Sequence, residues 1–215
     1  MSTVAESHPA TQAPVVAEPP PPVGAMAGDP AILGLPVFVA GSIALAFQLT
    51  GYVSPAGGGA PLSIIFAATG IGLTISAIWA AALGQTLVAC IFGLFAGFWL
   101  SYTTLVLGLT HNWFGIVTAD IQHTVASFQI TWAIVMGALT IATLRLPVAF
   151  TAVVGLVVVA LVLLIFSTLN TNPDLAKAAG VVTFAFAGLG IYLFLSAAAV
   201  ATGGKGYPLG NAVLR

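Results

Sequence analysis

Titratable side chains, the groups that carry acid–base and metal chemistry, are scarce in this chain and gather in one segment. The sequence holds 4 Lys and Arg, 5 Asp and Glu and 3 His. Three of these groups, His111, Asp120 and His123, fall between two apolar blocks. Histidine changes charge between about pH 5 and 8, so one hypothesis is a pH-sensing loop, and the competing one is an ordinary solvated loop. Two His and one Asp at these spacings match no common zinc pattern, and we expect no metal site.

The apolar blocks contain essentially no Asp, Glu, Lys, Arg or His. An ionisable group inside a membrane costs roughly 2.5–3.5 kcal/mol on insertion scales, and pumps and proton relays keep such groups because their chemistry requires them. A membrane hydrolase needs acid, base or nucleophilic groups at membrane depth, and a cytochrome needs histidines inside the bundle. We therefore predict that the protein is not an enzyme, has no catalytic residue and binds no cofactor.

Neutral polar side chains are the groups that remain inside the blocks. Ser101, Tyr102, Thr103 and Thr104 are consecutive, and hydroxyls that line a path replace part of the hydration shell of a small solute. The competing hypothesis is that these hydroxyls donate to carbonyls of their own helix. A path without acid or base groups would suit passive or weakly coupled flow.

The elements that must position these groups are membrane helices. The sequence is 60% hydrophobic and 4% charged, with a mean hydropathy of +1.13, and a bilayer span takes about 20 apolar residues. A net charge of -1 without a run of Lys or Arg argues against nucleic-acid binding. We predict an all-α integral membrane protein with six transmembrane helices, at residues 33–53, 61–83, 87–109, 126–143, 148–169 and 178–201.

The six spans divide the chain into a membrane domain and two tails. Residues 1–28, with the run Pro19 to Pro22, are predicted to form a disordered, polyproline-like tail. Residues 29–205 form the transmembrane domain, and residues 206–215 a short C-terminal tail.

Cations indicate the orientation of the spans, whose even number puts both termini on one side. If that side is cytoplasmic, Arg145, Lys205 and Arg215 lie inside and Lys177 lies outside. This is the sense that membrane proteins favour. We expect both termini to be cytoplasmic and the protein to lie in the plasma membrane.

The start of the first span combines a helix cap with a proline inside the helix. Asp29 is a good N-cap, and Pro30 suits the first helical position. Pro36 removes a backbone donor and leaves the carbonyl near Ile32 without its partner, so the first turns should be bent or loosened. One hypothesis is that freed N–H groups beside Gly34 meet a small anion, and the other is a capped helix with a harmless proline.

Four motifs in this order resemble the acetate uptake transporter family, also called the Gpr1/Fun34/YaaH or succinate-acetate permease family. Asp29-Pro30-Ala31-Ile32-Leu33-Gly34-Leu35 is similar to its N-P-A-P-L-G-L entrance motif, and Gly84-Gln85-Thr86 to its G-N-T. Phe98-Trp99-Leu100 matches its aromatic F-W pair, and Ile191-Tyr192-Leu193 its sixth-span motif. The resemblance covers residues 29–210.

The resemblance implies a homo-hexamer with one pore in each protomer, which passes acetate, related monocarboxylates or succinate. Phe38 falls on the family's pore phenylalanine and Phe95 on its pore tyrosine. Val157 falls on a hydrophobic constriction, and Gly190 on a position that sets substrate size. The entrance motif, the hydroxyl cluster and the sixth-span motif add further expected pore residues: Gly34, Leu35, Tyr102 and Tyr192.

The chain departs from the family pattern at Asp29, which replaces Asn, and at Ile32, which replaces Pro. Polar and charged features of the family's second span are missing around residues 70–83. An aspartate at an anion entrance would repel carboxylate. Two alternatives stay open: a channel for small neutral solutes such as urea or short amides, and a membrane scaffold without transport whose small residues only pack.

Overall fold

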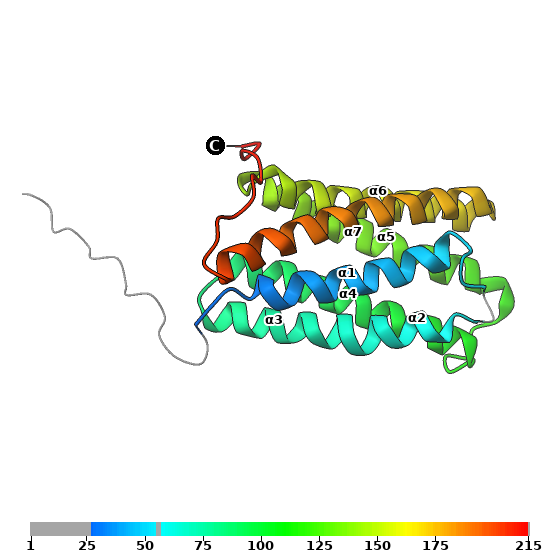
Figure 1. Ribbon diagram of the computed structural model, residues 1–215. Helices are drawn as coiled ribbons and strands as arrows, with labels where there is room; N and C mark the ends of the chain where they lie inside the picture. Colours follow the sequence, from blue (N-terminus) through cyan, green and yellow to red (C-terminus); the bar gives the residue numbers. More distant parts are fainter. Residues whose placement is uncertain (1–26, 55–56, 215) are drawn as a thin grey trace, which may run out of the picture.

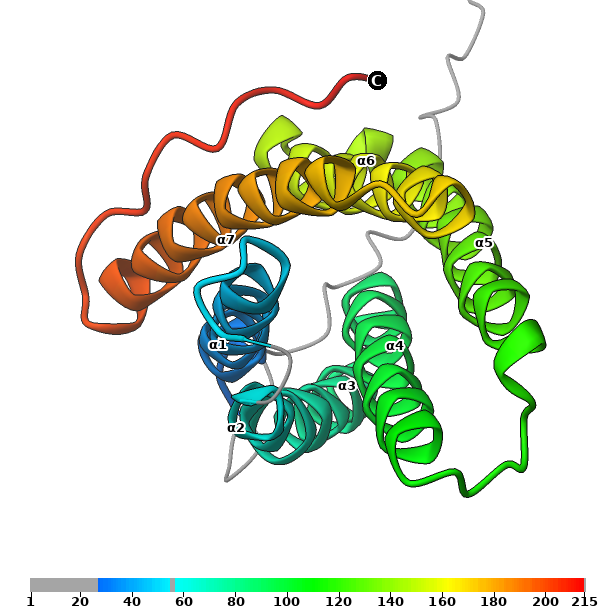
Figure 2. The same ribbon diagram turned by 90° about the vertical axis from the view of Figure 1, so that its right-hand side faces the viewer.

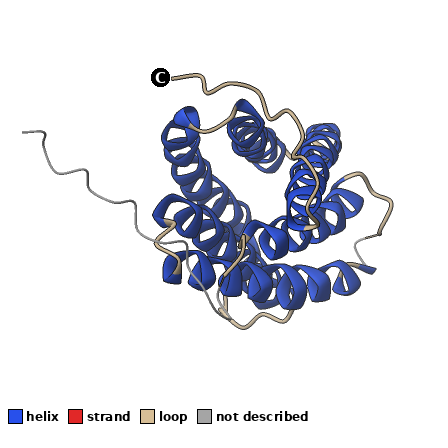
Figure 3. Cartoon of the chain, turned by 60° about the vertical axis from the view of Figure 1, so that its left-hand side comes forward, coloured by secondary structure: helices blue, strands red, loops and turns tan. Residues whose placement is uncertain are grey.

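The computed structural model describes residues 27–54 and 57–214 of the chain, so most of the predicted N-terminal tail lies outside the described residues. Within these ranges the protein is helical, and Figure 3 draws no strand. Six stretches are long and apolar enough to cross a membrane, as predicted. The helices of the structure are α1 (Ala31–Leu49), α2 (Gly59–Ser63), η2 (Ile64–Gly70), α3 (Ile71–Ala82), α4 (Thr86–Thr110), α5 (Thr118–Ala142), η3 (Thr143–Arg145), α6 (Val148–Asn170) and α7 (Pro173–Ala201).

The helices run side by side along one common direction (Figure 1), and seen from the end they form a ring. Around this ring α1 packs on α7, α7 on α6 and α6 on α5, while α4 packs on α3 and η2, which return to α1 (Figure 2). Contact between α4 and α5 is sparse. The start of α1 and the end of α7 lie at the same end of the bundle (Figure 1), as an even number of spans requires.

The second span is not α-helical throughout. It contains a π-helical segment, η2, between the α-helices α2 and α3. π-Helical segments are rare in proteins as a whole, but those that occur are often found at functional sites. Thr69 of η2 is buried, and its hydroxyl donates to the carbonyl of Val37 in α1 at 2.8 Å. This bond fixes the second span to the part of α1 that carries Phe38.

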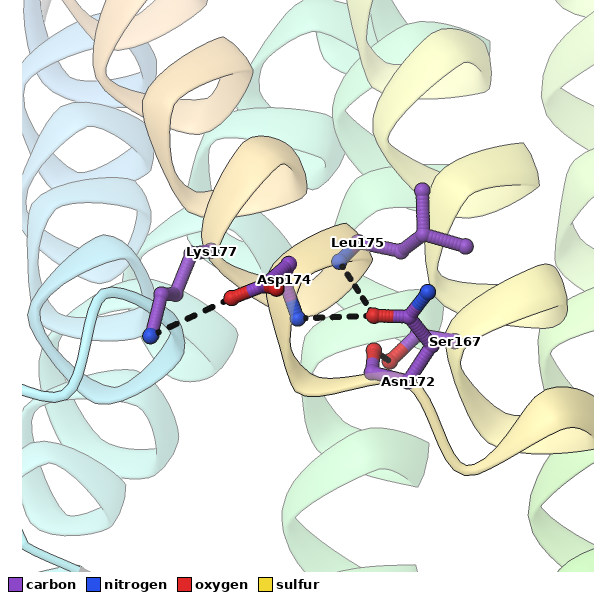
Figure 4. A network of polar contacts seen from close by, with 5 residues as sticks. All are labelled: Ser167, Asn172, Asp174, Leu175 and Lys177. Atoms are coloured by element: carbon purple, nitrogen blue, oxygen red, sulfur yellow. Dashed lines mark hydrogen bonds and ion pairs between the residues drawn. The ribbon is translucent and has the colours of Figure 1, made fainter.

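The fourth and sixth spans begin earlier than predicted. The segment between residues 110 and 125 is not all loop: α5 starts at Thr118, so Asp120 lies in its first turn and His123 lies within the helix. At α7 the Asn172 side chain accepts from the N–H groups of Asp174 and Leu175 at 3.0 and 3.4 Å (Figure 4). A search for apolar blocks misses such polar first turns, which caps and the helix dipole stabilise.

The start of α1 is also more regular than predicted. The Asp29 carboxylate accepts the N–H of Ala31 at 2.9 Å, although α1 begins one residue later than predicted, with Pro30 rather than Asp29 at the N-cap. The helix continues through Pro36, so the predicted loosening is not found. The N–H of Gly34 donates to the carbonyl of Pro30 at 3.0 Å, and the hypothesis of free N–H groups for an anion is wrong. One proline removes one bond, and the neighbouring bonds keep the turn.

The segment after α7 folds back over the start of α6. The N–H groups of Val148 and Ala149 donate to the carbonyls of Asn211 and Leu209 at 3.2 and 3.1 Å. These N–H groups belong to the first turn of α6, where a helix leaves donors without internal partners. The C-terminal segment therefore caps α6, and Leu209 packs against the core.

The outer faces of the bundle carry large apolar side chains. Ile78, Ile134 and Ile141 are each more than 60% exposed. In water such surfaces would be costly, whereas lipid chains or apolar partner surfaces cover them without penalty.

Candidate functional site

Three cavities follow one another along the inside of the bundle. A cavity of about 230 Å³ lies at the end where α1 begins, and we call it the proximal vestibule. A cavity of about 230 Å³ lies at the end where α1 finishes, the distal vestibule. Between them lies a central cavity of about 20 Å³, roughly a tenth of the volume of either vestibule and little more than one water molecule needs. The path is wide at both ends and narrow in the middle.

The linings show that the three cavities are neighbours. Phe95 of α4 lines both the proximal vestibule and the central cavity. The central cavity and the distal vestibule share four lining residues, Leu45, Phe98, Leu161 and Leu164. The three cavities therefore adjoin one another, with these side chains between them.

The narrow part is made of apolar side chains from four helices. The rings of Phe38 and Phe95 meet edge to face, with centroids 4.9 Å apart, and Phe186 of α7 lies 5.8 Å from Phe38. Val157 of α6 lines the central cavity. Phe38, Phe95 and Val157 are each 4% exposed, and such a ring of apolar groups excludes water and ions unless it widens. The structure therefore brings together three of the residues predicted for the pore.

The proximal vestibule is apolar except at its mouth. Leu35, another predicted pore residue, lines it together with Phe92 and Phe150. Asp29 also lines it and is exposed. This carboxylate is the charged group in the lining, and it stands where water can solvate it.

The distal vestibule holds two polar side chains among apolar ones. Tyr102 of α4 and Gln129 of α5 both line it. The Tyr102 hydroxyl donates to Gln48 Oε1 over a long distance of 3.5 Å, and Gln48 Nε2 donates to the carbonyl of Gly58 at 3.0 Å. Gln129 is buried, and its Oε1 has no hydrogen-bond partner among the described residues.

Of the four consecutive residues Ser101 to Thr104 on α4, three bond to their own helix and one lines a cavity. Ser101, Thr103 and Thr104 donate to the carbonyls of Phe98, Trp99 and Leu100 in their own helix. These three hydroxyls therefore satisfy carbonyls of their own helix rather than line a path for a solute. Tyr102 alone of the cluster lines one of the three cavities.

The two glycines predicted for the pore, Gly34 and Gly190, lie where neighbouring side chains leave no room for a Cβ. A Cβ at Gly34 would overlap the ring of Phe92, and a Cβ at Gly190 would lie 2.8 Å from Val39 Cγ2 and 3.6 Å from the ring of Phe38. Neither residue lines the three cavities. Gly190 lets α7 approach α1 closely beside Val39 and Phe38.

Tyr192 lies away from the three cavities. Its hydroxyl donates to the carbonyl of Pro208 at 2.8 Å, and its ring lies 5.5 Å from that of Tyr207. The residue therefore fastens the C-terminal segment to α7.

Sequence reasoning missed several lining residues. Gln129 and Phe186 were not among the expected pore residues, and neither were Phe150 and Trp99. A glutamine within an apolar span was a usable signal for the first, because a buried amide needs partners. Trp99 lines the central cavity, and its Nε1 is a second buried polar atom without a partner among the described residues.

The linings of the three cavities lack the basic side chains of a typical anion site. Asp29 and Tyr102 are the ionisable side chains in the linings of the three cavities, and no Lys, Arg or His belongs to them. His111, Asp120 and His123 lie near the distal end without lining the cavities. No group of three metal-binding side chains occurs in the described ranges. The arrangement can therefore select by size and hydrogen bonding, but it offers no fixed positive charge.

Comparisons with known proteins agree with this geometry. The sequence model of the GPR1/FUN34/yaaH family matches residues 12–208. A solved structure described as the bacterial acetate channel SatP has the same fold, with a TM-score of 0.76 and 21% identity over 85% of this chain and 99% of that chain. No curated protein sequence matches the chain.

Proposed function

Because this chain belongs to the GPR1/FUN34/yaaH family, we propose that it is a membrane channel or secondary transporter for acetate and related short carboxylates, succinate among them. The solute enters one vestibule, passes the apolar ring of Phe38, Phe95 and Val157, and leaves through the other vestibule. The description of the structural relative as an acetate channel supports this class of solute. We further propose that the protein lies in the plasma membrane with cytoplasmic termini.

The observation that carries the proposal is the line of three cavities with a closure between them. A scaffold without transport has no need for two cavities of about 230 Å³ that share lining residues with a third between them. Protein interiors otherwise pack with few voids larger than a water molecule. The apolar ring closes the path to water and ions, and the methyl group of a short carboxylate can make apolar contacts with the ring as the solute passes.

The exposed apolar faces support assembly of several copies, as the family resemblance implies for a hexamer. The face of α5 is the least covered of the six spans, since 22% of its most apolar window is buried. Each protomer has its own line of cavities, so the proposed path lies within a protomer rather than between copies.

A second candidate function is a channel for urea or short amides. The observation that favours it is the lack of a basic side chain in the linings of the three cavities. Such linings suit uncharged solutes, because burial of an unpaired charge is costly.

Flux into liposomes that contain the full-length protein tests these functions together. Radiolabelled acetate, succinate and urea are applied in parallel, and flux into empty liposomes is subtracted. We expect acetate flux well above the empty control and little urea flux. Urea flux without acetate flux would favour the second candidate, and no flux of any solute would favour the scaffold.

A further inference from the structure

Gln129 is a buried polar side chain whose position the fold does not explain. It lies within α5, is 8% exposed and lines the distal vestibule. Its Oε1 has no hydrogen-bond partner in residues 27–54 and 57–214. A buried carbonyl oxygen without a donor destabilises a protein, and an apolar residue of the same size would avoid this cost. The amide therefore suggests a ligand that supplies the donor.

The surroundings of the amide limit the chemistry of that ligand. The lining nearby is apolar, with Leu45, Leu161 and Leu164. The Tyr102 hydroxyl is directed to Gln48 Oε1. A carboxylate anion would need a cation or several donors to offset its lost hydration, and the linings provide no basic side chain.

A carboxamide offers one acceptor oxygen and two N–H donors in one plane. Oε1 itself is buried, but the terminal torsion of a carboxamide is broad, so a rotation of the amide turns this oxygen toward the cavity. The matching group carries a donor and an acceptor side by side. An undissociated carboxylic acid fits this description, and a primary amide shares the same pattern.

We infer that the distal vestibule contains a subsite in which the Gln129 amide binds a short carboxylic acid in its undissociated form. This inference rests on the proposed function. The acid O–H donates to Oε1, and Nε2 donates to the carbonyl oxygen of the acid. The hydrocarbon part of the acid lies against the apolar lining. With a cavity of about 230 Å³ there is room for an acid of a few carbon atoms and for water.

Binding of the undissociated form makes the apparent affinity depend on pH. A simple carboxylic acid resembles the Glu side chain, whose pKa is about 4.3, so its undissociated fraction falls about tenfold for each pH unit well above that value. Of the elements around Gln129, α4 contributes the titratable Tyr102 to the lining, while α1 and α6 contribute leucines and no titratable group. His123 and Asp120 on α5 itself and His111 after α4 lie outside the lining.

The test measures acetate binding to the full-length protein in lipid nanodiscs by tryptophan fluorescence. Trp99 and Trp132 both pack on Phe98, with ring centroids 4.9 and 5.5 Å away, so they report on this part of the path. In the wild type we expect the Kd for total acetate to rise about tenfold for each pH unit from pH 5 to 7. A Kd for total acetate that does not change with pH would overturn the inference, since the site would then take the anion.

The Gln129→Leu variant removes both hydrogen bonds and retains the bulk. We expect about tenfold weaker acetate binding at pH 5, together with an unchanged or higher Tm because the unpartnered oxygen is gone. The matched control is Thr131→Val on the same helix, an exposed residue whose hydroxyl donates to Ser127 O, and it should bind acetate as the wild type does. Gln129→Met, a flexible apolar side chain of similar length, repeats the test if Leu does not fold. Wild-type affinity in the folded variants would overturn the inference.

Acetamide provides an independent arm, because it offers the same donor and acceptor but does not titrate. We expect acetamide to bind the wild type with a Kd that is independent of pH and to bind Gln129→Leu about tenfold more weakly. Equal acetamide affinity in both proteins would count against the subsite. Radiolabelled acetate flux in the same preparation separates the two ideas: no wild-type flux contradicts the proposed function, whereas wild-type flux with unaltered Gln129→Leu binding contradicts only the subsite.

Discussion

The two vestibules have equal volumes, about 230 Å³, and opposite chemistry. The proximal vestibule has a charged group, Asp29, at a position exposed to solvent, and its deep part is apolar. The distal vestibule has no charge in its lining, but it holds the neutral polar side chains of Tyr102 and Gln129. A charge is tolerated at the mouth because water solvates it, whereas deep polar groups remain neutral since burial of a charge is far more costly. On the path we propose, the solute meets a solvated charge in the proximal vestibule and neutral polar groups in the distal vestibule.

The strongest test of this comparison closes the connection between the vestibules. In Val157→Phe the larger side chain has only a central cavity of about 20 Å³ to fill. We expect acetate flux to fall to the level of empty liposomes, with a loss of stability of about 1–3 kcal/mol from overpacking. Val159→Phe is the control, because Val159 lies on the same helix and is 46% exposed. Normal flux through Val157→Phe would mean that the solute does not pass the central cavity.

The opposite change widens the narrow part. In Phe95→Ala the ring that lines both the proximal vestibule and the central cavity is removed. We expect the flux of larger carboxylates to rise about tenfold, as for a barrier lowered by about 1.4 kcal/mol, and stability to fall by about 3–5 kcal/mol. The exposed Phe166 of α6 provides the control Phe166→Ala. If the size selectivity of Phe95→Ala equals that of the wild type, Phe95 does not form the constriction.

A smaller effect is expected at Gly190, where α7 passes close to α1 beside Phe38. In Gly190→Ala the new methyl group would lie 2.8 Å from Val39 Cγ2, so α1 and α7 must shift at a cost of about 1–3 kcal/mol. We expect reduced acetate flux and a lower Tm. Gly188→Ala has nothing within 4 Å of its Cβ and should gain up to about 1 kcal/mol of helix stability with normal flux. Equal Tm values in the two variants would contradict the close contact at Gly190.

The smallest change concerns the charge of the proximal mouth. Asp29→Asn keeps an oxygen that can accept the Ala31 N–H and removes the repulsion of an arriving carboxylate. Two unit charges 4 Å apart in water interact by about 1 kcal/mol, so acetate flux at neutral pH should rise by less than about fivefold. The gain should shrink at high ionic strength. Asp120→Asn, near the distal end and outside the cavity linings, is the control, and an equal rise there would remove Asp29 from the entrance.

Much of the fold could be predicted from the sequence, but the ends of the helices could not. The apolar blocks predicted all six spans, because a bilayer demands long apolar stretches. They missed the polar start of α5, which has Asp120 in its first turn, and that of α7, which has Asn172 at its N-cap. The resemblance to a family supplied Phe38, Phe95 and Val157, which the residues alone did not single out.

The sequence by itself determined that the chain forms six membrane helices and that their interior lacks fixed charge, since both follow from composition along the chain. Only the tertiary structure decided which polar groups meet a cavity. Tyr102 and Tyr192 are both tyrosines of apolar spans, yet the first lines the distal vestibule and the second donates a hydrogen bond to the carbonyl of Pro208 in the C-terminal segment. The facing direction of a side chain depends on how its helix is rotated against its neighbours, and close contacts such as Gly190 with Val39 set that rotation. Hydropathy along the chain does not report on these contacts.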